Sequence, residues 1–299
     1  ATRLGDALQN ISFIMSIAGA FDVPYEVEYL HEFEVLFNNT EKPIVYSAPG
    51  VDASKRVLAM ASEIAGGTEE LRKRPMLSLY SETLSPLTFI AENENMIEFA
   101  RSSIPITLGP SPLMGATAPA TICGAFVVGN AENLGAITLT QLVNPGTPVV
   151  YACWSSLMDP RIGRAAYAAP ERALSTSVIN AQMAGFYGLP NFGFAGCADS
   201  KMPDAQAGAE VMMISLMNAL AGVNLMHDCG YLAGGSVGSM EMAVICDEIL
   251  GLISRIVSGV QVNEETLAVD VIRSVGPEGN FLSHKHTLKF VKDIYLPDI

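Results

Sequence analysis

Apolar residues follow two alternating patterns along the chain. Short, mostly apolar runs bounded by Pro, Gly or polar residues are typical of strands buried on both faces. Between them lie longer segments in which apolar positions recur every three or four residues, as in amphipathic helices. The predicted strands are residues 11–17, 43–47, 76–81, 105–108, 148–154, 191–196 and 224–229. The predicted helices are residues 25–38, 52–65, 92–102, 121–143, 171–187, 204–221 and 239–257.

This alternation predicts an α/β fold with a parallel sheet and right-handed crossovers. About seven consecutive units favour a closed (β/α)8 TIM barrel, with an open doubly wound sheet as the alternative. A barrel needs eight strands, and residues 1–9 resemble the end of a helix, so we expect the first strand to be missing from this chain. We expect residues 264–299 to add one or two helices and a tail, and residues 1–299 to form a single domain.

Composition narrows the classes of partner. Charged residues are 16% and hydrophobic residues 49%, which argues against disorder and supplies a large core. The formal net charge of −14 disfavours nucleic acid and would suit a cationic ligand, although generic solubility is the better explanation of the charge. No signal peptide and no uninterrupted apolar stretch of about 18–20 residues is found, so we expect no membrane partner. Five widely spaced cysteines without a CxxC motif predict a reducing, cytoplasmic setting, and the apolar content favours a homo-oligomer.

Chemistry in a TIM barrel gathers at the carboxyl ends of the strands. Residues selected by this position are Tyr80, Ser81, Glu82, Trp154, Phe194, Asp199, Lys201 and His227. Four of them have an equally simple structural role: Glu82 as a solvated loop charge, Trp154 as a packing residue, Asp199 as a turn-former and His227 as a core histidine. His284 and His286 lack acidic or cysteine neighbours, so we expect no metal site.

Common catalytic motifs are absent, which leaves several reaction classes open. The sequence has no GxGxxG after a strand, no P-loop, no GxSxG elbow and no HExxH. The residues alone therefore indicate an acidic and aromatic barrel mouth that suits a small, cationic molecule. Two alternatives remain: a lyase or aldolase that uses Lys201 in a Schiff base, and a non-catalytic protein that binds a cationic osmolyte.

Six segments of the chain together form a recognisable set. They are residues 111–121 (SPLMGATAPAT), 131–151 (AENLGAITLTQLVNPGTPVVY), 170–174 (PERAL), 182–190 (QMAGFYGLP), 198–210 (ADSKMPDAQAGAE) and 277–288 (PEGNFLSHKHTL). As a set they resemble the corrinoid-dependent trimethylamine methyltransferase family. The likeness runs over nearly the whole chain, in order and at consistent spacing.

The resemblance implies a (β/α)8 barrel that moves a methyl group from a methylated amine to the cobalt of a separate corrinoid protein. It implies that the corrinoid (cobalamin) is carried by that partner, with no cofactor bound tightly by this chain. Family members that act on trimethylamine contain pyrrolysine, whereas this chain has only common residues and looks like the group that demethylates quaternary amines such as glycine betaine. Family proteins are longer at both ends, so we expect this chain to be truncated at both.

Under this reading the substrate is a small quaternary or tertiary amine whose methyl carbon is attacked in line with the C–N bond. A quaternary nitrogen has no N–H, so aromatic faces and carboxylates must hold it. We assign catalytic roles to Glu82, Asp199 and His227. Substrate-binding roles fall to Tyr80, Ser81, Trp154, Phe194 and Lys201.

Overall fold

The computed structural model describes residues 1–297 and is built around parallel strands. The parallel strands are β1 (Ile44–Tyr46), β2 (Leu77–Ser81), β3 (Ile106–Leu108), β5 (Val149–Val150), β8 (Phe192–Phe194) and β9 (Leu225–His227). The first four form one sheet in the order β1-β2-β3-β5, and β8 pairs with β9. Two isolated parallel bridges extend this order: Ile14 with Ile44 adds a position beside β1, and Tyr151 with Asn191 joins β5 to β8. The mixed α/β class with parallel strands is therefore confirmed.

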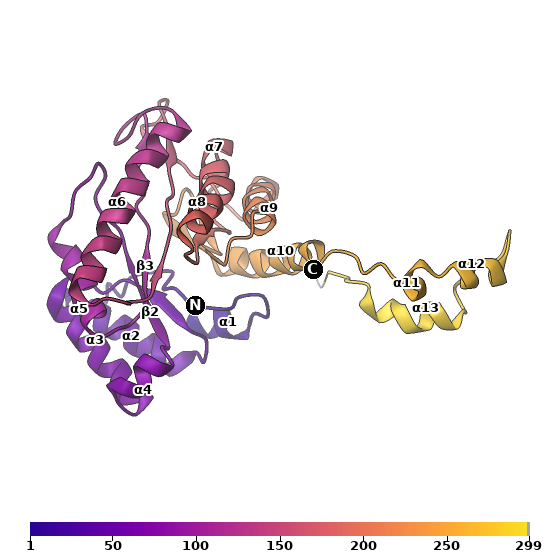
Figure 1. The fold of residues 1–299 in the computed structure, drawn as a ribbon, viewed down its shortest axis with the longest axis horizontal. Helices are drawn as coiled ribbons and strands as arrows, with labels where there is room; N and C mark the ends of the chain where they lie inside the picture. Colours follow the sequence, from indigo (N-terminus) through magenta and orange to yellow (C-terminus); the bar gives the residue numbers. More distant parts are fainter. Residues whose placement is uncertain (298–299) are drawn as a thin grey trace.

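Helices separate the strands in sequence and surround them in space (Figure 1). In Figure 1, α2, α3, α5 and α6 lie on one side of the strands and α7 to α10 on the other. The helices of this body are α1 (Thr2–Ala7), α2 (Glu28–Asn39), α3 (Gly50–Ala65), α4 (Thr68–Lys73), α5 (Glu94–Arg101), α6 (Ile122–Val143), α7 (Pro170–Leu174), α8 (Asn180–Tyr187), α9 (Ala205–Leu220) and α10 (Met240–Val257). A π-helical segment, Ser175–Ile179, joins α7 to α8.

Short strands form a rim beyond the carboxyl ends of the parallel strands. After β3 and β5 come β4 (Leu113–Met114), β6 (Ser156–Asp159) and β7 (Arg164–Ala166), which make a small sheet in the order β4-β6-β7. After β9, β10 (Tyr231–Leu232) and β11 (Val237–Gly238) form an antiparallel hairpin. The sequence pattern did not predict these strands, because they lack the longer apolar runs that mark the buried strands.

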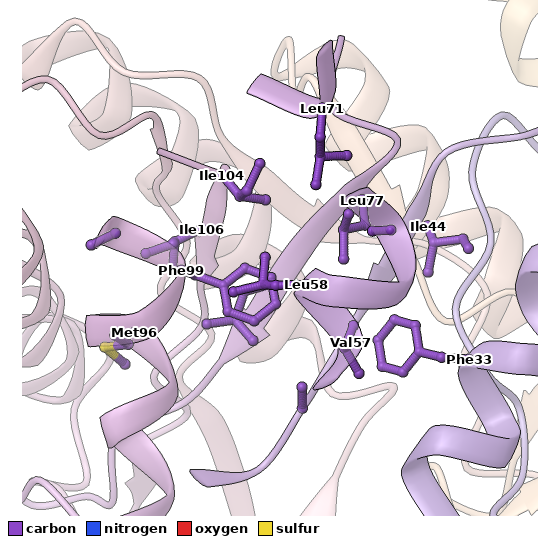
Figure 2. Close-up of a cluster of buried hydrophobic side chains, with 14 of the residues drawn as sticks. Phe33, Ile44, Val57, Leu58, Leu71, Leu77, Met96, Phe99, Ile104 and Ile106 are labelled. Carbon is purple, nitrogen blue, oxygen red and sulfur yellow. The ribbon is translucent and has the colours of Figure 1, made fainter. Parts of the chain in front are cut away.

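The largest core cluster fills the space between the first strands and helices α2, α3 and α5. Leu77, Ile106, Val57, Phe33 and Phe99 all lie in it and are at most 3% exposed. Figure 2 shows side chains from these strands and helices pointing toward one another. Burial of apolar area of this kind is the main favourable term in folding.

The strand predicted at residues 11–17 forms only in part. Only Ile14 is assigned a bridge, to Ile44, and residues 11–17 have no ladder with β9 in the described part of the chain. A cavity of about 780 Å³ lies between this segment and β9, and Phe13, Met15, Leu225 and His227 contribute to its wall. Residues 11–17 thus pair with β1 at a single position, which is too little for a strand.

Helix α6 has the length and composition of a membrane-spanning helix, on those two criteria alone. It lies in the body of the protein, where one third (33%) of its most apolar window is buried. The core helices of water-soluble proteins meet the same criteria, so this helix is weak evidence of a membrane.

The end of the described chain forms an arm that stands away from the body (Figure 1). It contains the short helices α11 (Glu264–Leu267), α12 (Val269–Val275) and α13 (Lys285–Phe290). Apolar side chains are exposed along it, among them Val260 at 83%, Val262 at 74% and Leu282 at 83%. Helices this short are not stable by themselves in water.

Replacement of Phe99 by alanine should lower the free energy of unfolding by about 3–5 kcal/mol, because it leaves a cavity in the main cluster. Phe186 is 79% exposed on α8, so Phe186→Ala is a matched control and should change that free energy by less than about 0.5 kcal/mol. Denaturant titration of both variants measures the difference. Equal losses in the two variants would contradict this description of the core.

Candidate active site

Five rings meet where the parallel strands end. They belong to Tyr80 on β2, Trp154 after β5, Phe192 and Phe194 on β8, and His227 on β9. The ring centroids of Tyr80 and Trp154 are 5.6 Å apart and nearly parallel. The His227 ring lies 4.4 Å from Trp154 and stacks on Phe192 at 4.5 Å. The strand-end rule thus brings Tyr80, Trp154, Phe194 and His227 into one cluster, as their positions in the sequence predict.

Trp154 forms the floor of this cluster. Its side chain is 2% exposed, and its indole N–H donates to the carbonyl oxygen of Phe192 at 3.0 Å. Tyr80 stacks on its face, so the Tyr80 ring, which is half-buried, lies closer to solvent. Gly109 allows this stack, because a Cβ atom there would lie about 2.9 Å from the Trp154 ring and 3.0 Å from Tyr80. Direct contact between a ligand cation and Trp154 would therefore require Tyr80 to move.

Two carboxylates border the rings. The Tyr80 hydroxyl donates to Glu82, and Asp228 contacts His227 Nδ1 at 2.6 Å. Glu82 is exposed to solvent, yet the protein around it removes enough water to raise the pKa of its carboxyl group. Burial and the nearby Glu82 charge also raise the pKa of Tyr80, so its hydroxyl stays protonated and can donate. These groups give the aromatic edge a negative side.

Arg172 is a site residue that the sequence analysis missed. It comes from α7 and is 1% exposed. Its guanidinium carbon lies 4.0 Å from the centroid of the Tyr167 ring and 3.9 Å from that of Phe194. Its charge favours the ionised form of Glu82. The available signal was that Arg172 and Glu171 are the only charged residues of the predicted helix 171–187.

Asp199 positions the segment that carries Tyr167 and Arg172. Its two carboxylate oxygens accept the backbone N–H groups of Tyr167 and Ala168, each at 2.9 Å. Both oxygens of the Asp199 carboxylate thus already accept hydrogen bonds from the backbone. Its predicted catalytic role stays a prediction, while the contacts themselves indicate a positioning role.

Two other predicted residues lie outside the cluster. Ser81 is buried and donates to the side-chain oxygen of Asn95 at 3.0 Å, so its hydroxyl serves the core. Lys201 is exposed in the loop before α9. Their roles in substrate binding stay predictions. Within residues 1–297, no group of three or more His, Cys, Asp or Glu residues is arranged to hold a metal ion.

The chain matches the family model described as trimethylamine methyltransferase over residues 1–299. It is similar to the trimethylamine methyltransferase MttB of Desulfitobacterium hafniense strain DSM 10664 / DCB-2, at 38% identity over 96% of this chain and 58% of that protein. It is 35% identical to the glycine betaine methyltransferase of Desulfitobacterium hafniense strain Y51, over 93% of this chain and 58% of that protein. It is also 35% identical to the trimethylamine methyltransferase MttB1 of Methanosarcina acetivorans, over 97% of this chain and 59% of that protein. The chain therefore spans less than two thirds of the length of these relatives.

The geometry predicts that a quaternary ammonium binds near Glu82 in a pH-dependent way. The ionised carboxylate attracts the cation, and this attraction is lost as the pH falls through the Glu82 pKa. Because that pKa is raised, the loss should begin above about pH 4.3, the ordinary value for glutamate. Titration calorimetry with tetramethylammonium as a function of pH measures the loss, and we expect about a tenfold decrease in affinity, which corresponds to about 1.4 kcal/mol of charge–charge attraction.

Glu82→Gln should remove this pH-dependent step, whereas Glu63→Gln, an exposed position on α3, should retain it. An unchanged pH profile in Glu82→Gln would show that another group governs binding of the cation.

Proposed function

The chain belongs to the trimethylamine methyltransferase family, and we propose that it takes a methyl group from a quaternary or tertiary methylated amine, such as glycine betaine. The acceptor in this proposal is the Co(I) of a separate corrinoid protein, which acts as a substrate. Relatives named for trimethylamine and for glycine betaine both support a methylated amine as methyl donor. The observation that carries the proposal is the group of rings and carboxylates around Tyr80 and Glu82.

The residues of this chain would bind and orient the donor. A methylated ammonium lies against the outer face of Tyr80, with Glu82 and Asp228 supplying opposite charge. Each desolvated aromatic contact of this kind is worth about 0.5–2 kcal/mol. The methyl carbon is transferred with cleavage of the C–N bond, whose electron pair stays on the amine nitrogen. A quaternary ammonium therefore leaves as a neutral tertiary amine and needs no proton from the protein.

Alignment is the second contribution of the site. The Tyr80 ring is stacked on Trp154, and its hydroxyl is bonded to Glu82, so its face has one orientation. A donor held on that face presents one methyl group toward the open side of the rim. Fixing two reactants in this way contributes up to about 7–11 kcal/mol in ideal systems.

We further propose that residues 1–299 form one TIM-barrel methyltransferase domain. The segment at Ile14 and the six parallel strands from β1 to β9 would be seven of the eight barrel strands. The eighth strand would occupy the cavity between the Ile14 segment and β9. The greater length of the relatives leaves room for such a segment. An experimental structure of a longer form of the chain should place a parallel strand between Ile14 and Leu225; any other occupant of the cavity would count against the barrel.

A cytoplasmic homo-oligomer is the cellular form that we propose. The five free cysteines agree with a reducing compartment. The exposed apolar residues of the C-terminal arm, such as Val260 and Leu282, would be buried by a second subunit.

Methyl transfer is tested by mixing the protein with reduced cobalamin and a panel of quaternary and tertiary methylated amines. We expect absorbance changes from Co(I) to methyl-Co(III) with at least one of these donors. Tyr80→Leu removes the outer aromatic face and should raise the KM for that donor about tenfold, which corresponds to the loss of roughly 1.4 kcal/mol.

Phe186→Leu is the matched control, because Phe186 is 79% exposed near the end of α8, just before the amino end of β8 and so away from the carboxyl ends of the strands. It should leave the KM unchanged. A panel in which no amine binds or donates a methyl group would rule out the proposed reaction.

A further inference from the structure

Arg172 is among the largest fully buried side chains in the described part of the chain. No ion pair joins it to any carboxylate in residues 1–297. Its Nε and Nη1 atoms are buried and lack a hydrogen-bond partner among the described residues. Burial of a charged group without a partner is costly, so such a group points to a ligand that completes it.

The two rings around Arg172 hold the guanidinium without using its N–H groups. Tyr167 and Phe194 contact it at 4.0 and 3.9 Å from their centroids. The ring faces stabilise the charge of the guanidinium. They do not accept hydrogen bonds from its N–H groups, because these groups point outward in the guanidinium plane. The Nε–H group and the N–H groups of Nη1 thus remain available as donors in the guanidinium plane.

Nearby carboxylates are already engaged elsewhere. Glu82 accepts from Tyr80, Asp228 contacts His227 Nδ1, and Asp199 accepts from the backbone of Tyr167 and Ala168. The hydrogen bonds of Asp199 fix the loop that leads into α7, so Arg172 is held in place before any ligand binds. A rigid donor loses little freedom on binding, which favours affinity.

We propose that Arg172 binds the carboxylate of a zwitterionic methyl donor, a quaternary ammonium that also carries a carboxylate group. This inference rests on the proposed function and assigns a specificity-determining residue to the same site. The onium end lies toward Tyr80, Glu82 and Asp228, and the carboxylate end accepts charge-assisted hydrogen bonds from the Arg172 guanidinium. Trimethylamine has no group that Arg172 could bind.

Ligand selectivity tests this assignment. Glycine betaine and choline share a trimethylammonium head, but choline carries a hydroxyl group in place of the carboxylate. We expect glycine betaine to bind the unmodified protein at least tenfold more tightly than choline, as measured by calorimetry. Arg172→Gln should remove this preference by weakening glycine betaine alone, and Arg172→Lys should restore part of it. Arg56→Gln, an exposed position on α3 with the same change in charge, should retain the full preference.

A stability measurement separates ligand binding from a structural role. Arg172→Met keeps the length of the side chain and removes the unpaired charge, so the Tm without ligand should stay the same or rise. The increase in Tm caused by glycine betaine should be lost. A lower Tm together with weaker choline binding would instead make Arg172 a structural clamp and overturn the proposal.

The outcomes also separate this inference from the function on which it rests. Equal binding of choline and glycine betaine to the unmodified protein would overturn the role of Arg172 and leave methyl transfer from an onium standing. If no methylated ammonium binds or donates a methyl group, the proposed function fails, and the inference fails with it.

Discussion

The parallel arrangement of the strands is the constraint on which the site depends. Parallel strands all end at one edge, so residues more than a hundred positions apart, such as Tyr80 and His227, become neighbours there. Hydrogen-bonded ladders fix the directions of the strands. The core cluster that contains Phe99 and Leu77 holds the helices against these strands. The ring cluster is therefore a product of the backbone order, and loops contribute Glu82, Asp228 and the segment before Arg172.

Charge separation within this edge gives the site its chemical character. The carboxylates of Glu82 and Asp228 border the rings, while the positive charge of Arg172 is buried between Tyr167 and Phe194. Charges at the edge of a protein interior interact more strongly than charges in bulk water, because the protein replaces part of the solvent around them. A zwitterionic molecule would satisfy both signs at once, whereas a simple cation would leave Arg172 unpaired. Ligand charge thus becomes a basis for selection among methylated amines.

Much of the fold could be predicted from the sequence, because each long helix and buried strand has its own periodicity. The segments 43–47, 76–81 and 191–196 contain β1, β2 and β8, and most helix ends agree within a few residues. The strand-end rule also found Tyr80, Trp154 and His227. It missed Arg172, because that residue reaches the site from a helix that follows β7, and a buried position for arginine goes against its usual exposure. It likewise could not show that Asp199 is bonded to backbone N–H groups or that Trp154 lies beneath Tyr80, because both depend on contacts between distant segments.

A crystal structure with glycine betaine bound tests the central claim most directly. The ammonium nitrogen should lie within about 6 Å of the Tyr80 ring centroid, on the side of Glu82. A carboxylate oxygen should lie about 2.7–2.9 Å from an Arg172 nitrogen. Density for the ligand elsewhere, for example in the cavity beside Phe13 and Met15, with the rings and Arg172 uncontacted, would contradict the claim that the strand ends bind a methylated ammonium.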